Sequence, residues 1–166
     1  MVLEQKYIID EPLLKTLDTI IRGSGADPRK IGDLTNLSYL KRSGNFDRNH
    51  FLFLWSTEDM NPVAFVSGAI GIPYYATRTY AYLHHWFKGQ KVVINDMFVI
   101  EAEHSHGLGT GMFNTVTQYV GNKIGQSFIV GTVALYKAWD FYEKRLGMKK
   151  SYINNEYEGH WKIIGG

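Results

Sequence analysis

The residues whose type and spacing most clearly suggest a ligand-binding site are the glycines at positions 107, 109 and 111, which alternate with other residues. They follow a largely apolar run of strand length, 92–100, and from Leu108 to Val120 the apolar residues recur at helical spacing. Glycines at the start of a helix leave backbone N–H groups accessible, and the helix dipole adds partial positive charge there. The sequence therefore predicts an anion-binding loop, which suits a phosphorylated ligand.

The spacing of these glycines excludes two common phosphate-binding motifs. A dinucleotide fingerprint requires G-x-G-x-x-G and an acidic residue about 20 positions further on. Here the third glycine comes one position early, and Gly131 stands where the acid is expected. A Walker-type loop requires Gly-Lys-Ser/Thr, which this sequence lacks. The pattern that remains is His104-x-x-Gly107-x-Gly109, directly after the strand.

Several ionisable groups near the loop could take part in chemistry. Asp96 lies inside the apolar run, where a carboxylate is costly to bury unless it is paired or functional. It is either a general base or a structural acceptor of hydrogen bonds, and Glu101 and Glu103 are the alternative bases. His104 and His106 could assist a bound phosphate when protonated, below about pH 6.5. Because cysteine is absent and no third ligand is evident, we predict no metal site.

Composition and charge predict a single cytoplasmic domain over residues 1–166. A hydrophobic content of 45% excludes a disordered chain. The formal net charge of +2 argues against a nucleic-acid partner bound mainly by phosphate neutralisation. The apolar runs are too short to span a membrane, and the N-terminal residues lack the apolar core of a signal peptide.

The expected elements alternate in a way that is typical of a mixed sheet. They are a strand at 7–9, helices at 10–23 and 33–42, a hairpin of 50–55 and 62–72, an irregular aromatic stretch at 73–91, a strand at 92–100, a helix at 108–120, a strand at 127–133, a helix at 135–146, and strands at 148–153 and 160–164. Adjacent strands indicate antiparallel pairs, and the strand–helix–strand unit across 92–133 indicates a parallel pair. The aromatic stretch suits either a substrate wall or a subunit interface, which leaves a homodimer open.

Three motifs, at residues 95–99, 104–109 and 138–148, resemble those of the GNAT (N-acetyltransferase) superfamily and follow one another in the order found in that family. His104-x-x-Gly107-x-Gly109 is similar to the family's Gln/Arg-x-x-Gly-x-Gly/Ala signature, with histidine at the first position. Residues 95–99 (NDMFV) resemble the E/N-D-L/F-F-V strand seen in amine and polyamine N-acetyltransferases, among others. Residues 138–148 (AWDFYEKRLGM) resemble the family's A-x-x-h-Y-x-k-x-G-F segment, with methionine in place of the final phenylalanine.

The resemblance implies a fold and a cosubstrate. The fold would be the α/β (α+β) GNAT fold, a mixed central sheet of about six to seven strands flanked by about four helices, with a splayed central strand. The cosubstrate would be acetyl-CoA, whose pantetheine arm would pair with the main chain of Phe98 and Val99 like an added strand. Its pyrophosphate would be received by the amides of the loop, which are those of His104, Ser105, His106, Gly107, Leu108, Gly109 and Thr110.

The same resemblance gives Tyr142 a catalytic role. Its hydroxyl would protonate the departing thiolate, which suits a phenol because its pKa of about 10 keeps it protonated at neutral pH. The plainer interpretation is a core tyrosine on the apolar face of the helix at 135–146. With Asp96 as base, the prediction is an acetyl-CoA-dependent N-acetyltransferase that modifies a primary amine of a small molecule or protein, by direct attack in a ternary complex. The alternative is a catalytically weakened CoA-binding or regulatory module, because positions 95, 104 and 135 depart from the family pattern.

Overall fold

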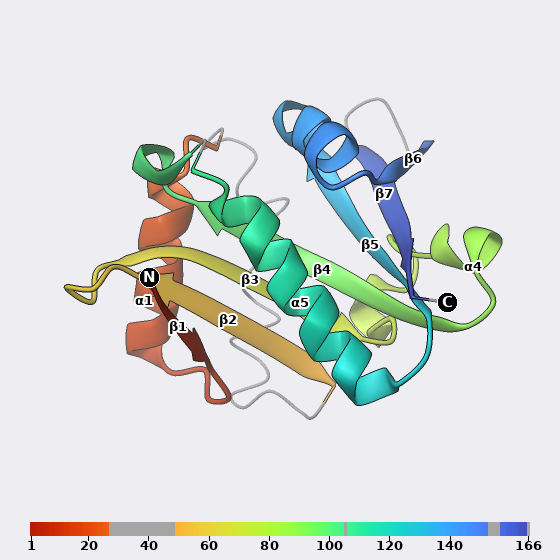
Figure 1. Ribbon diagram of the computed structural model, residues 1–166, viewed down its shortest axis with the longest axis horizontal. Helices are drawn as coiled ribbons and strands as arrows, with labels where there is room; N and C mark the ends of the chain where they lie inside the picture. The colour runs from red at the N-terminus through yellow and green to blue at the C-terminus, as the bar shows by residue number, and fades with distance from the viewer. Residues whose placement is uncertain (27–48, 105, 153–156, 166) are drawn as a thin grey trace. The chain divides into compact units, whose positions relative to one another are not determined.

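The computed structural model describes residues 1–26, 49–104, 106–152 and 157–165 (Figure 1). The helix expected at 33–42 lies outside the described residues. The chain forms two compact units, one of Met1–Gly68 with Asp96–Met112 and one of Ala69–Asn95 with Phe113–Gly166. A single domain over 1–166 stays a prediction. Within the described ranges, no helix combines the length and apolar character that crossing a bilayer requires.

The strands are hydrogen-bonded in the order β1-β2-β3-β4-β5-β7-β6, a seven-stranded sheet. The strands are β1 (Val2–Gln5), β2 (His50–Ser56), β3 (Pro62–Ile70), β4 (Gln90–Val99), β5 (Phe128–Leu135), β6 (Lys149–Tyr152) and β7 (Tyr157–Ile164). The pair β4–β5 is parallel, whereas β1–β2, β5–β7 and β6–β7 are antiparallel. This mixed sheet confirms the predicted α/β (α+β) fold class, and the predicted hairpin and final strand pair are present as β2–β3 and β6–β7.

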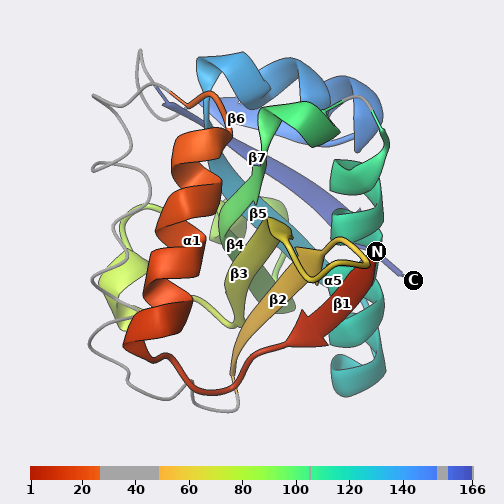
Figure 2. The ribbon, with the colours of Figure 1, turned by 90° about the vertical axis from the view of Figure 1, so that its left-hand side faces the viewer.

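In the first unit, helix α1 (Glu11–Gly23) lies beside the strands (Figure 2). Asp10 caps the helix, because its Oδ1 accepts a hydrogen bond from the Leu13 amide at 2.9 Å, and Pro12 occupies the first turn. The apolar face of α1 is buried against β2 and β3 in a cluster made up of Leu13, Leu14, Leu17, Ile20, Ile21, Leu52, Leu54 and Phe65, with Ile9 at its edge. The helix predicted from this periodicity is confirmed.

The first strand lies earlier than predicted. The sequence indicated a strand at 7–9, but β1 pairs with β2 from Val2 opposite Ser56 to Gln5 opposite Phe53. Tyr7 and Ile8 are instead exposed. The local apolar run was misleading because the pairing partner, rather than strand propensity, decides which residues extend the sheet.

The parallel ladder between β4 and β5 ends partway along β4. It pairs Gln90 with Phe128 and continues to Ile94 opposite Thr132, whereas β4 runs on to Val99. Where the ladder ends, the Ile94 carbonyl accepts hydrogen bonds from the Thr132 hydroxyl at 3.1 Å and from the Tyr80 hydroxyl at 3.0 Å. Both bonds are buried. Side-chain hydroxyls thus satisfy the carbonyl at this point, and the predicted splay of the central strand is present.

The hydroxyl groups of two tyrosines, Tyr80 and Tyr82, attach the aromatic stretch at 73–91 to the strands of the second unit. The Tyr82 hydroxyl lies 3.0 Å from the Thr132 carbonyl and 2.9 Å from the His160 carbonyl, in two neighbouring strands. Burial raises the pKa of Tyr82 well above its usual value, which keeps the phenol protonated as a donor. A Cβ built on Gly159 would lie 2.5 Å from the Tyr82 Cζ, and one built on Gly131 would lie 3.0 Å from its hydroxyl, so the ring occupies a space that only glycines leave. Tyr80 and Tyr82 are therefore structural residues.

The helix predicted at 135–146 is present over residues 136–145, but its geometry is irregular. Strand β5 continues to Leu135 because it pairs with β7 that far, Leu135 lying opposite Tyr157. A 3₁₀ turn follows at Tyr136–Ala138 (η3), and then a π-helical segment at Phe141–Arg145 (η4), in which the Leu146 amide donates to the Phe141 carbonyl at 3.2 Å. The remaining helices are α4 (Leu83–Trp86) and α5 (Leu108–Ile124), which is longer than predicted, with a further 3₁₀ turn at Tyr74–Ala76 (η1).

The slot for Tyr82 generates a stability prediction. We expect Gly159→Ala to lower the free energy of unfolding by about 1–3 kcal/mol, because the added methyl overlaps the buried ring. Urea unfolding followed by circular dichroism measures the change. The control is Gly121→Ala inside α5, where the nearest atom lies 4.0 Å from the new Cβ; it should be neutral or stabilising by up to about 1 kcal/mol. Equal effects of the two substitutions would contradict this role of the glycine.

Candidate functional site

The glycine-rich turn at the start of α5 is open. In the first unit, β4 leads through a 3₁₀ turn at Glu101–Glu103 (η2) to this turn. Gly107 has φ of 75°, in the left-handed region that favours glycine, and no described atom lies within 4 Å of a Cβ built on Gly107 or Gly111. The Gly111 amide makes a helical bond to the Gly107 carbonyl at 3.1 Å, whereas helix geometry leaves the amides of Leu108, Gly109 and Thr110 without such partners. The turn can therefore accept an anion through its backbone.

His104 contacts the end of β4 rather than the glycine turn. Its Nε2 lies 2.8 Å from the Val99 carbonyl oxygen, which fixes the proton on Nε2 because a carbonyl can only accept. The Val99 carbonyl was predicted to pair with a pantetheine arm, so this imidazole occupies one of the main-chain groups that the prediction requires. A cosubstrate would have to share or displace that bond.

His106 pairs with an acid of the preceding turn. Its Nδ1 lies 3.3 Å from Glu103 Oε2, and the histidine side chain is exposed. The carboxylate offsets any positive charge that the imidazole carries, which weakens its attraction for a phosphate. The backbone amides are therefore the stronger phosphate ligands in this loop. Ser105, between the two histidines, lies outside the described residues.

Asp96 and Phe98 occupy different environments on β4. Asp96 is only 3% exposed, and its Oδ2 accepts a hydrogen bond from the Ser67 hydroxyl at 3.2 Å. The sequence did not single out Ser67, although a serine in an otherwise apolar strand, as β3 is, could have indicated a buried partner. The Phe98 ring stacks on Phe65, with centroids 5.8 Å apart, and packs against the α1 cluster. Of the two, the acid remains the candidate for chemistry, whereas the Phe98 side chain belongs to the core.

Tyr142 belongs to the second unit and lies in η4. Its side chain is 6% exposed, and its ring stacks on His160 with centroids 5.9 Å apart and an interplanar angle of 30°. His160 Nε2 in turn lies 2.9 Å from Glu143 Oε2. The sequence analysis missed His160, because only the pairing of β7 with β5 brings it to Tyr142, and it did not single out Glu143, the next residue after Tyr142. The interpretation of Tyr142 as a packed tyrosine and the catalytic one both remain compatible with this environment.

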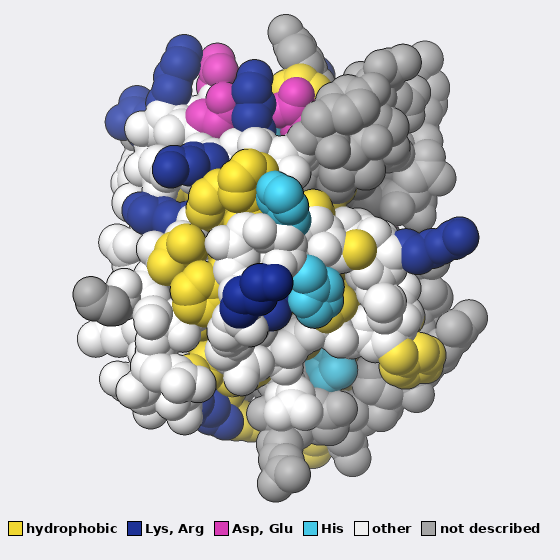
Figure 3. All heavy atoms as spheres, turned by 90° about the vertical axis from the view of Figure 1, so that its right-hand side faces the viewer, with side chains coloured by type: hydrophobic (Ala, Val, Ile, Leu, Met, Phe, Trp, Pro, Cys, Tyr) yellow, Lys and Arg dark blue, Asp and Glu magenta, His cyan; other side chains and the backbone are white. Residues whose placement is uncertain are grey.

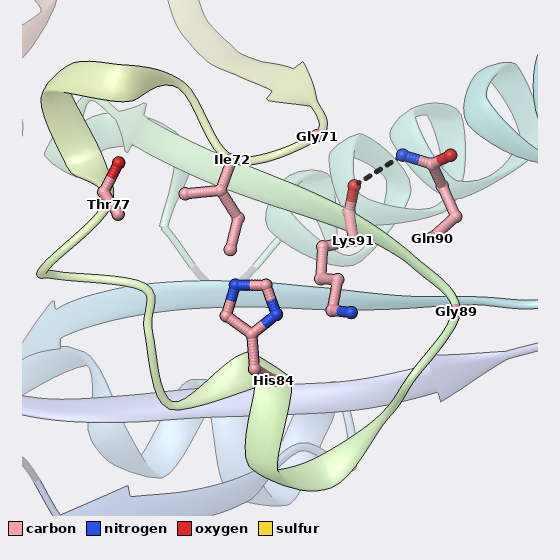
Figure 4. Close-up of a pocket in the computed structure, with 7 residues that line it drawn as sticks. All are labelled: Gly71, Ile72, Thr77, His84, Gly89, Gln90 and Lys91. Carbon is pink, nitrogen blue, oxygen red and sulfur yellow. Dashed lines mark hydrogen bonds between the residues drawn. The ribbon is translucent and has the colours of Figure 1, made fainter.

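A shallow pocket lies elsewhere in the second unit, at the start of β4 (Figure 4). Its volume is about 380 Å³, and its lining consists of Gly71, Ile72, Thr77, His84, Gly89, Gln90 and Lys91. The figure shows the His84 ring below Ile72 and the Lys91 side chain beside it. All lining residues are half-buried or exposed, and none was predicted as a site residue. We therefore do not assign the function to this pocket.

The face that carries α4 exposes histidines among hydrophobic side chains (Figure 3). The exposed residues of this stretch include Tyr74, Tyr75, His84, His85 and Trp86. The Trp86 ring stacks on Trp161 with centroids 4.8 Å apart, and its Nε1 donates to the Ser151 hydroxyl at 3.3 Å, so part of this face is structural. A substrate wall and a subunit interface both stay predictions.

Comparison of the sequence with known protein families identifies one matching family. The family described as "Acetyltransferase (GNAT) family" matches residues 22–148. A search of curated proteins finds no match.

Solved structures of low sequence identity share the architecture over nearly their whole length. An aminoglycoside 6'-N-acetyltransferase complexed with coenzyme A superposes with a TM-score of 0.63 at 14% identity, over 99% of this chain and 96% of that one. The ribosomal-protein-S18-alanine N-acetyltransferase from Escherichia coli gives 0.59 at 10% identity, over 98% and 93%. An acetyltransferase of the GNAT family from Staphylococcus aureus gives 0.58 at 10% identity, over 98% and 99%. At these identities the superpositions establish the fold alone, and the family match covers most of the chain. The chain belongs to the GNAT acetyltransferase family.

Proposed function

We propose that this protein transfers an acetyl group from acetyl-CoA to a primary amine, by direct attack in a ternary complex. The observation that carries the proposal is the open glycine turn, where Gly107 and Gly111 are exposed and a Cβ built on either meets no described atom within 4 Å. Backbone N–H groups and a helix dipole at such a turn fit a pyrophosphate. The thioester of acetyl-CoA would supply the activated acyl group.

In this proposal, the chain's own residues manage two proton movements. An amine arrives largely as its ammonium form and must lose a proton before it can attack. Asp96 serves as the base, and since it is almost fully buried, it acts through water rather than by direct contact. Its hydrogen bond from Ser67 holds the carboxylate in one orientation. The Tyr142 hydroxyl donates a proton to the departing thiolate.

The acceptor amine belongs to a small molecule or a protein. Among the structural neighbours, one acts on an aminoglycoside and another on the alanine of a ribosomal protein, so this fold accommodates both classes of amine. The exposed aromatic side chains of 73–91 are candidates for contacting such a substrate.

A second candidate function is a module that binds CoA without transferring its acyl group. The departures from the family pattern favour it, which are asparagine at position 95, histidine at 104 and leucine at 135. Tight CoA binding with no consumption of acetyl-CoA across a panel of amines would favour this module over the enzyme.

The first test measures cosubstrate binding at the glycine turn. We expect isothermal titration with acetyl-CoA to give one site per chain. Gly107→Ala should weaken binding at least tenfold, because alanine resists the left-handed conformation that the turn requires. Gly111→Ala is the matched control, since its Cβ meets nothing within 4 Å and its φ is not left-handed; it should retain binding within about threefold. No heat of binding at millimolar acetyl-CoA would remove the proposal.

The second test separates a catalytic Tyr142 from a packed one. Tyr142→Phe should lower kcat by about 10²-fold or more while the Kd for acetyl-CoA stays within a few-fold, because phenylalanine keeps the ring and removes only the proton donor. Tyr119→Phe in α5 should leave kcat unchanged. Thiol release with a chromogenic reagent measures turnover. Unchanged kcat in Tyr142→Phe would leave this tyrosine as a core residue.

The third test concerns the base. We expect Asp96→Asn to lower kcat by about 10²-fold and to abolish the acid limb of its pH profile, since the amide cannot accept the proton. Glu103→Gln, which removes the alternative base, should leave both nearly unchanged. Thermal unfolding of each variant checks that the buried substitution has not unfolded the protein. The reverse pattern, in which only Glu103→Gln lowers kcat, would identify Glu103 in η2 as the base instead.

A further inference from the structure

Three side chains that offer metal-ligand atoms meet in the second unit. Glu143 comes from η4, and Glu158 and His160 come from β7, where residues two apart point to the same face of the strand. One ligand atom from each lies within 4.8 Å of the others. His160 Nε2 and Glu143 Oε2 are 2.9 Å apart. We call these three residues the Glu–Glu–His cluster.

The burial of this cluster leaves polar atoms unsatisfied. His160 is 0% exposed, and within the described part of the chain its Nδ1 has no hydrogen-bond partner. Glu158 Oε2 is also buried and lacks a partner among the described residues. The only bond described for the histidine side chain is therefore the one to Glu143, inside the cluster. A buried carboxylate oxygen is unfavourable unless a donor or a cation faces it.

The described cations nearby do not neutralise the two carboxylates. Lys150 lies opposite His160 in the β6–β7 register and so on the same face of the sheet. It is exposed and forms no ion pair with the residues that the structure describes. Lys162 donates to the Leu146 carbonyl at 2.8 Å instead. The cluster thus combines two acids and an imidazole without a described counter-charge.

We propose that Glu143, Glu158 and His160 bind a divalent transition-metal ion such as Zn²⁺ or Mn²⁺. One imidazole nitrogen and two carboxylates suit these ions better than Ca²⁺ or Mg²⁺, which prefer oxygen ligands alone. One ring nitrogen of His160 and one carboxylate oxygen of each glutamate lie within 4.8 Å of one another, so side-chain rotation can bring all three to the distance of about 2.0–2.2 Å that such ions require. The Glu143 side chain is 32% exposed, so one of the three ligands is in contact with solvent.

An ion at this position would also fix the segment around it. The His160 ring stacks on Tyr142, and Trp139 lies with its ring centroid 6.4 Å from that of His160. Glu143 is the next residue after Tyr142, so the ion would connect η4 to β7. Metal binding in this sense is independent of acetyl transfer, and both can be tested separately.

The experiment first removes bound metal from the 166-residue protein with a chelator and then titrates it with ZnCl₂ and with CoCl₂. We expect one ion per chain at micromolar concentrations, a visible cobalt absorption band, and a higher Tm that a chelator reverses. Glu158→Gln keeps the side-chain shape but removes a ligand charge, and it should weaken binding at least tenfold; Glu143→Gln should do the same. Asp140→Asn, an exposed acid beside η4 but outside the cluster, should bind like the wild type.

Other outcomes would overturn the site. Wild-type protein that binds neither ion at millimolar concentration would show that the Glu143–His160 bond is a purely structural hydrogen bond. Binding that is unchanged in both glutamine variants but lost in His106→Gln would place the ion at the two histidines of the glycine loop. Because Glu143 and Glu158 are not fully buried, these variants test the site even if substitution of His160 prevents folding.

Discussion

The hydrogen bonds that the Ile94 carbonyl accepts mark the point where β4 stops pairing with β5 and its main chain becomes accessible to a ligand. The Ile94 oxygen accepts bonds from the hydroxyls of Thr132 and Tyr80, at the residue where the parallel ladder with β5 stops. Beyond it, β4 remains attached to the first unit, where the amide that follows the strand, Ile100 N, donates to the Val63 carbonyl at 3.0 Å. The residues that carry the candidate chemistry on β4 all come after the ladder has ended. A strand that is bonded on both sides could not offer its main chain to a ligand.

The same tyrosine-rich stretch that supplies Tyr80 shows how the fold uses glycines. Gly131 and Gly159 lie on neighbouring strands, and the absence of their side chains gives the Tyr82 ring its space. A buried phenol needs a partner, and the Tyr82 hydroxyl has carbonyls of both strands within bonding distance. The composition of residues 73–91 suggested only a substrate wall or a subunit interface. Tyr80 and Tyr82 show a further role, because an aromatic side chain with a polar end can also anchor an irregular segment to the sheet.

The hydrogen bonds around the glycine turn refine the roles of its side chains. His104 is committed to the Val99 carbonyl and His106 to Glu103, so the backbone is the main anion-binding element of the loop. Asp96 is buried with Ser67 as a partner, which is compatible with either a base or a structural acceptor. The Glu–Glu–His cluster, in contrast, comes from η4 and β7, which only the fold brings together, so residue types and spacing in the sequence did not indicate it.

The sequence by itself determined the elements whose signals are local. Apolar periodicity and the Asp10 cap specify α1, alternating glycines after an apolar run specify the turn before α5, and three motifs in order specify the family. Tertiary structure decided everything that depends on pairing across the sheet. It moved the first strand to Val2–Gln5, extended β5 to Leu135 so that the predicted helix begins one residue later, and placed His160 against Tyr142. The physical reason is that propensity and caps act within a few residues of the chain, whereas strand register and the burial of a polar side chain are fixed by partners that the sequence order does not reveal.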